Sequence, residues 1–162
     1  MKFIRLTAVL LLAATVLAAG CSKPAPVSTA SAKPPKHEHK PPHGGTPVVL
    51  GDEVYHVELV RDAATGKLQA FVFDGELENF IRSSVPTVEI DATVNGATQV
   101  LVLNAVANPA TGETIGDTSL FEGQADWLKT AKEFDATLKT ITIRGTTFTD
   151  VKFNFPKGND KD

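Results

Sequence analysis

A two-residue alternation of apolar and polar side chains constrains the fold of this chain more than any other feature. It runs from residue 48 to residue 155 and is interrupted at near-regular intervals by turn motifs rich in Gly, Asn and Pro. In residues 87–94, four apolar residues fall on one face and four polar residues on the other, as in a half-buried β-strand. Asn95-Gly96 follows directly, and this dipeptide favours a tight hairpin because both turn positions require positive φ.

Seven segments have the composition and period of strands. They are residues 53–61, 67–74, 87–94, 99–107, 118–123, 137–144 and 148–155. The fourth is nearly all apolar, which is compatible with cover on both of its faces. Residues 125–134 have apolar side chains at helical spacing and predict one or two helical turns. The pattern therefore predicts an all-β domain, an antiparallel β-sandwich of Ig-like architecture with one short helix, with a small β-barrel as the alternative.

Most of the aromatic residues lie in the C-terminal third of the chain, and we expect them to form one wall of the core. They are Phe121, Trp127, Phe134, Phe148, Phe153 and Phe155.

The first twenty residues predict a signal peptide. A short positive region with Lys2 and Arg5 precedes an apolar run, and small residues lead to Cys21, the single cysteine of the chain. Residues 17–21 resemble the lipobox of bacterial lipoproteins. The resemblance implies that Cys21 is acylated and anchors the protein to a membrane, facing the periplasm. In such lipoproteins an Asp after the cysteine favours the inner membrane, so Ser22 favours the outer membrane.

Residues 21–47 are predicted to form a disordered tether, because they hold seven of the ten prolines and almost no large apolar side chain. Residues 48–156 form the predicted β-domain, and residues 157–162 are a polar tail that we expect to fray. Once Lys2 and Arg5 are removed with the signal peptide, 14 basic residues stand against 19 acidic ones. This acidic balance disfavours nucleic acid as a partner and leaves the lipid as the expected contact with the membrane.

All four histidines lie between residues 37 and 56, and they are the best candidates for chemistry in this chain. His37, His39 and His43 fall within seven residues of the predicted tether, and clustered imidazoles bind Cu²⁺ or Zn²⁺. The alternative is a polar tether that happens to contain histidines. His56 and Glu58 are two residues apart on a predicted strand, so they project from one face.

The two glycines after His43 allow the chain to fold back onto the domain, which would add His43 as a third ligand to His56 and Glu58. The alternative for His56 and Glu58 is the solvated face of an edge strand. In both cases we expect these side chains to be exposed.

The segment with His43-Gly44-Gly45, a short apolar run, Gly51-Asp52 and a strand containing Glu58 resembles the HGG-led periplasmic segments of heavy-metal efflux adaptor proteins. It is also similar to small bacterial lipoproteins with the same lead-in, and the resemblance covers residues 43–74. It implies periplasmic metal handling, with His43 and Glu58 facing the metal. The coiled-coil hairpin and lipoyl halves of a full adaptor are missing here, so we do not expect this chain to form an efflux conduit.

No hydrolase, P-loop, HExxH or CxxC motif is present, and a nucleophile would have one histidine in the folded domain as its partner. We therefore expect no enzymatic activity. The sequence predicts a lipid-anchored periplasmic metal-binding accessory protein of the Cu/Zn class. The alternative is a cell-envelope lipoprotein with a structural role or a protein partner and no role in metal binding.

Overall fold

The computed structural model describes residues 40–160, which consist almost entirely of antiparallel strands. In chain order the elements are β1 (Thr46–Leu50), β2 (Tyr55–Asp62), β3 (Lys67–Asp74), β4 (Thr87–Val94), β5 (Ala97–Ala105), β6 (Leu120–Gln124), the 3₁₀ helix η1 (Asp126–Lys129), β7 (Phe134–Ile143) and β8 (Thr146–Phe155). No helix among these residues is long and apolar enough to cross a membrane.

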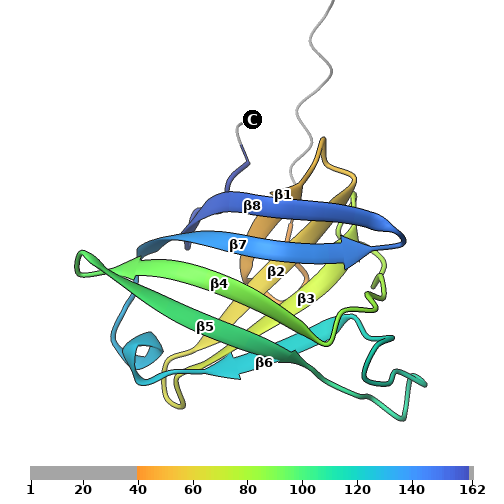
Figure 1. Ribbon diagram of the computed structural model, residues 1–162, viewed down its shortest axis with the longest axis horizontal. Helices are drawn as coiled ribbons and strands as arrows, with labels where there is room; N and C mark the ends of the chain where they lie inside the picture. Colours follow the sequence, from red (N-terminus) through yellow and green to blue (C-terminus); the bar gives the residue numbers. More distant parts are fainter. Residues whose placement is uncertain (1–39, 161–162) are drawn as a thin grey trace, which may run out of the picture. The chain divides into compact units, whose positions relative to one another are not determined.

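The eight strands form one sheet in the order β1-β2-β3-β6-β5-β4-β7-β8. The sheet curls until its two end strands, β1 and β8, come into contact, which gives a nearly closed barrel (Figure 1). The predicted all-β class is confirmed, and the small barrel that we considered as an alternative describes the arrangement. The predicted short helix is the single 3₁₀ turn of η1.

The inside of the barrel holds the hydrophobic core, and the alternation in the sequence identifies its members in β2 and β4 correctly. Val57 and Leu59 of β2 and Val88 and Ile90 of β4 are at most 1% exposed in this core. The apolar run of the fourth strand, which was compatible with cover on both faces, is buried on one face only. Leu101 and Leu103 of β5 point inward, whereas the outward Val100 and Val102 are 59% and 45% exposed.

The C-terminal aromatic residues pack in or against the core, as predicted. The Phe134 and Phe155 rings stack with centroids 5.0 Å apart, and Trp127 meets Phe134 edge-on at 5.2 Å. Phe148 fills the space beside the β1–β2 turn and contacts Tyr55 edge-on at 6.0 Å.

The segment after β8 helps to close the barrel, contrary to the expectation that it frays. The Asn159 side chain accepts a hydrogen bond from the Val49 backbone N–H at 2.7 Å and donates one to the Val49 carbonyl at 3.1 Å. It thus makes both bonds that a neighbouring strand would make to this residue of β1. Thr46 Oγ1 also donates to the Pro156 carbonyl at 3.2 Å, and Gly158 is buried against Pro47.

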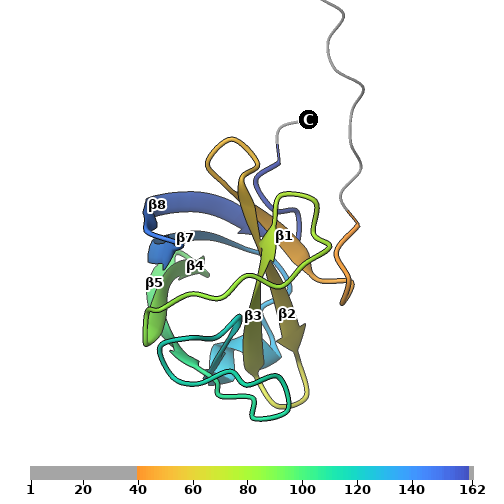
Figure 2. The same cartoon turned by 90° about the vertical axis from the view of Figure 1, so that its right-hand side faces the viewer.

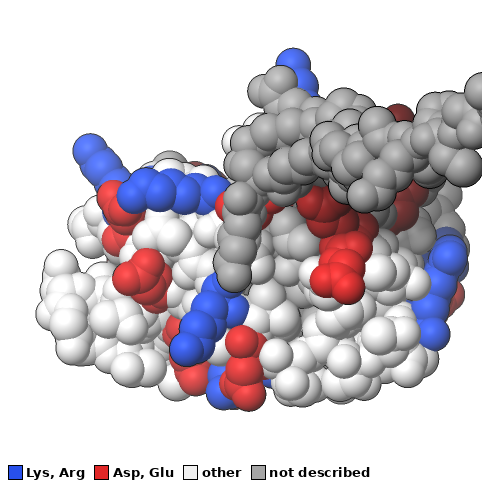
Figure 3. Space-filling model, turned by 90° about the horizontal axis from the view of Figure 1, so that it is seen from above, with Lys and Arg blue, Asp and Glu red and all other residues white. Residues whose placement is uncertain are grey.

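Charged side chains on the face seen from above are mixed, and basic groups lie beside acidic ones (Figure 3). Lys157 pairs with Glu133 at 2.6 Å, and Lys139 pairs with Asp150. Exposed pairs of this kind contribute little to stability, so the barrel depends on its core and its strand pairing.

Candidate functional site: the His43–Glu58 pair

Glu58 is a buried acid on the outer face of the barrel wall. Its neighbours in β2, Val57 and Leu59, point into the core, so Glu58 points the other way. In the sheet it lies between Pro47 of β1 and Phe71 of β3, yet it is 0% exposed. Something outside the sheet must therefore cover it.

The cover comes from the residues just before β1, which fold back over β2. The Glu58 Oε1 atom accepts hydrogen bonds from the backbone N–H groups of His43 and Gly45, both at 2.8 Å. The Oε2 atom lies 2.7 Å from Nδ1 of the His43 ring. Three donors thus satisfy a carboxylate that would otherwise be costly to bury.

The two glycines explain why this fold-back is possible, as the sequence predicted. Gly44 follows a turn closed by its N–H and the Pro41 carbonyl at 3.1 Å, and it has a φ of +67°, which favours glycine. Gly45 lies against β2, where an added Cβ would be 2.6 Å from the Leu59 carbonyl oxygen and 2.9 Å from Glu58 Cγ. The sequence His-Gly-Gly therefore brings two backbone donors and one imidazole onto a single carboxylate.

The His43 ring is held on its other side by phenylalanines. It stacks on Phe71 with centroids 4.1 Å apart and planes 15° apart, and Phe73 and Phe80 lie tilted at 6.1 and 6.2 Å. The side chain of His43 is still 36% exposed. The ring is consequently fixed in position but open to solvent.

The contact with Glu58 determines which nitrogen of the His43 ring is available to bind a metal ion. When the Glu58 carboxylate is ionised it has no hydrogen to donate, and Nδ1 of His43 then supplies the hydrogen of this contact. In the neutral ring, Nε2 then has the free lone pair. A carboxylate that holds one imidazole nitrogen while the other binds a metal is a recurrent arrangement in metalloproteins.

His56 and Glu58 do project from one face of β2, but the expectation that they are exposed is wrong, because each is 0% exposed. The lead-in segment covers Glu58, and Phe73, paired with His56 in β3, is itself buried. The His56 Nδ1 atom lies 3.4 Å from the Asp74 carbonyl oxygen.

The fold-back does not assemble the predicted three-ligand set of His43, His56 and Glu58. Between residues 40 and 160, no group of three His, Cys, Asp or Glu side chains is arranged to hold a metal ion. Three further predicted site residues, Cys21, His37 and His39, lie outside the described residues.

Sequence reasoning missed the aromatic support of this site. The alternation in 67–74 allows either face of β3 to point inward, so it does not place Phe71 and Phe73 beside the histidine. Phe80 belongs to the β3–β4 loop, residues 75–86, and no periodic signal marks it. The one available hint is that the strand after Glu58 has two phenylalanines at the two-residue spacing of one face.

Residues 40–160 thus form an all-β, barrel-like domain, in which the buried carboxylate of Glu58 in β2 is paired with the partly exposed His43 of the lead-in segment. Comparison with protein-family models, with curated proteins and with solved structures gave no match.

Proposed function

We propose that this protein is a metal-binding accessory protein of the bacterial cell envelope, and that Nε2 of His43 is a ligand for Cu²⁺ or Zn²⁺. The observation that supports this proposal is the 2.7 Å contact between His43 Nδ1 and Glu58 Oε2. This contact fixes a partly exposed imidazole whose Nε2 atom has a free lone pair. His39 and His37, four and six residues earlier in the chain, supply the further ligands in this proposal.

Glu58 has a different role in this proposal from the one that the sequence suggested. Each of its oxygens already accepts at least one hydrogen bond, and the residue has no exposed surface. It therefore orients His43 and makes the ring a better donor to the metal, rather than binding the metal itself. His56, fully buried, is left out of the metal site.

Calorimetric titration of the purified lipoprotein with Cu²⁺ and with Zn²⁺ tests the proposal. We expect binding of one ion, and a loss of at least about tenfold in affinity in His43→Ala and in the double variant His37→Ala/His39→Ala. Glu58→Gln should weaken binding by about 10- to 100-fold, because Nδ1 loses its carboxylate partner.

His56→Gln is the matched control, since it removes the one remaining imidazole. It should lower the stability of the domain, because His56 is fully buried, but leave metal affinity unchanged. The proposal is wrong if the wild-type protein binds no more tightly than an unstructured peptide with the same Pro, Lys and His content. A stable envelope partner retained by a variant without any of the four histidines would instead favour the alternative role in protein interaction.

The proposal includes a membrane anchor at Cys21, which the lipobox resemblance supports. An acylated Cys21 would hold the domain at the periplasmic side of a membrane, with the outer membrane favoured by Ser22. Cys21→Ser should move the protein from the membrane fraction to the soluble fraction of the cell. Unchanged fractionation, with no incorporation of labelled palmitate in the wild type, would contradict the anchor.

A further inference from the structure

A pocket lies beside the His43 site and shares Phe71 and Phe80 with it, but its charged and polar lining has no role in the proposed metal binding. It has a volume of about 270 Å³ and opens between the β3–β4 loop and the β5–β6 loop, residues 106–119. The two loops run side by side on the face shown in Figure 2, joined by hydrogen bonds between Ser83 and Thr118 at 2.8 and 3.2 Å. The pocket's lining includes Phe71, Phe80, Arg82, Glu113, Ser119 and Leu120.

Glu113 places an ionised carboxylate in the lining of this pocket. It is 8% exposed; its Oε1 atom accepts hydrogen bonds from the backbone N–H and the hydroxyl of Ser119, at 2.9 and 2.6 Å, and Oε2 accepts one from the Thr111 hydroxyl at 2.8 Å. Burial raises the pKa of Glu113, but these hydrogen bonds and the nearby Arg82 outweigh it and bring the pKa below the ordinary value of 4.5. The carboxylate is therefore ionised at neutral pH, and one of its roughly four acceptor positions is still free.

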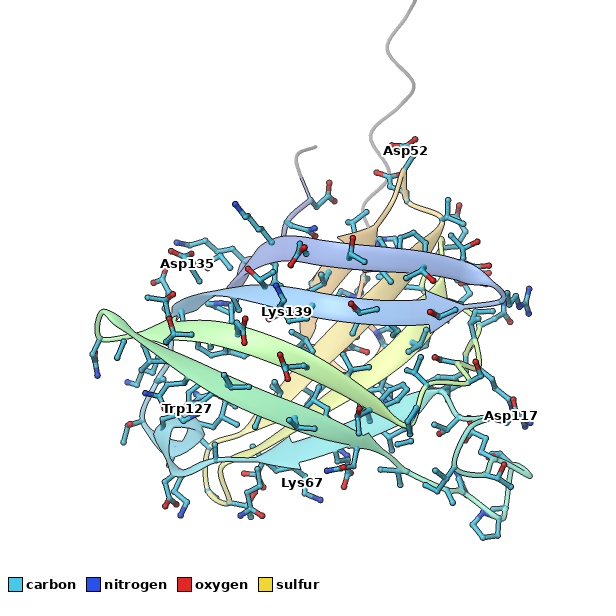
Figure 4. The ribbon with its side chains drawn as sticks, viewed as in Figure 1. Asp52, Lys67, Asp117, Trp127, Asp135 and Lys139 are labelled. Carbon is cyan, nitrogen blue, oxygen red and sulfur yellow. The ribbon has the colours of Figure 1, made fainter. Side chains whose placement is uncertain are left out.

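The positive charge of Arg82 is not directed at Glu113 only, because the guanidinium also binds other acceptors. Its guanidinium donates to Asp117 at 2.8 Å and to the Thr111 carbonyl at 2.6 Å. Asp117 lies on the projecting β5–β6 loop, where it is labelled in Figure 4. Asp117 does not line the pocket, but it pairs with Arg82, so Arg82, Asp117 and Glu113 together leave one negative charge in excess around the pocket, and this favours a cation.

Two aromatic rings restrict the kind of cation that fits. Phe80 is 54% exposed, although it stacks on Phe73 at 4.6 Å, and the rings of Phe71 and Phe80 are 6.3 Å apart. Aromatic faces attract organic cations and pack against alkyl groups. A pocket of this size is smaller than the range of about 300–1,000 Å³ that is usual for drug-sized ligands.

We propose that this pocket binds a primary ammonium group on a short unbranched alkyl chain, from a free alkylamine or from a lysine side chain of another protein. The ammonium group donates a hydrogen bond to Glu113, and the alkyl chain packs against Phe71 and Phe80. The ligand would contact neither His43 nor Glu58, although Phe71 and Phe80, which line this pocket, also lie beside the His43 ring.

Titration of the full-length protein in detergent with n-pentylamine, followed through the backbone amide signals of Glu113 and Ser119 in NMR spectra, tests this inference. We expect saturable shifts with pentylamine and at least about tenfold weaker binding of 1-pentanol, which has the same chain without the charge. Nα-acetyl-lysine N-methylamide, run in parallel, shows whether a protein-borne lysine fits as well as the free amine. Absence of shifts, or equal binding of amine and alcohol, overturns the proposal.

Three variants test whether pentylamine binding depends on this pocket or on the overall charge of the protein. Glu113→Gln should lower pentylamine affinity at least about tenfold. Phe80→Ala, at a half-exposed position, should lower it about threefold without unfolding the protein. Glu122→Gln makes the same charge change outside the pocket, at a carboxylate held by Lys67 and Gln69 at 3.0 and 2.6 Å, and should have no effect. An equal loss in Glu122→Gln, or unchanged affinity in both pocket variants, would contradict the inference.

Discussion

Gly45 is the residue at which the lead-in segment has least room. A Cβ there would lie 2.6 Å from the Leu59 carbonyl oxygen, so Gly45→Ala should lift the segment from β2. Glu58 then loses backbone donors while its own side chain is fixed in the sheet, at a cost of about 1–3 kcal/mol in unfolding free energy. Amide hydrogen exchange should show that the N–H groups of residues 43 and 45 lose their protection.

Gly44→Ala is the matched control for this variant. An added Cβ at Gly44 meets no atom within 4 Å, and the φ of +67° costs an alanine about 1–2 kcal/mol. We expect this variant to keep the protection of both N–H groups. If Gly45→Ala keeps it too, close packing of Gly45 on β2 does not hold the segment in place.

Among the strands, β1 is the one whose outer edge closes the sheet against the segment after β8. β1 has five residues and no strand partner beyond β2 over most of its length, so its second edge depends on the segment after β8. Asn159→Ala removes both hydrogen bonds to Val49 and should lower the free energy of unfolding by about 1–3 kcal/mol, as measured in urea.

Lys157→Ala is the control for this prediction in the same segment. It removes an ion pair with Glu133 whose two side chains are 70% and 57% exposed, so its effect should stay within about 0.5 kcal/mol. Equal losses in the two variants would mean that the segment contributes through charge rather than through pairing with β1.

Over the whole molecule, the sequence predicts the interior better than the exterior. The inward residues of β2 and β4 follow from alternation alone, because one face of each strand fills the barrel. The same rule misassigns the outward Val100 and Val102, since an apolar run does not reveal whether a second layer covers it. β1 is missed because it is short, begins beside Pro47 and follows a Pro-rich segment.

The site illustrates the same limit. The fold-back at Gly44-Gly45 is readable from the sequence, because it needs only local backbone freedom. The burial of Glu58 and His56 is not, because it depends on cover from other parts of the chain. For Glu58 that cover is the lead-in segment at His43, which Phe71 and Phe80 in turn support.

The central claim is that Glu58 holds Nδ1 of His43 so that Nε2 meets the metal. Nitrogen NMR of the His43 ring, recorded before and during a Zn²⁺ titration, tests it most directly. We predict a hydrogen on Nδ1 throughout and a metal-induced shift confined to Nε2, both lost in Glu58→Gln. A hydrogen on Nε2 in the free protein, or a ring signal indifferent to Zn²⁺, would contradict the claim.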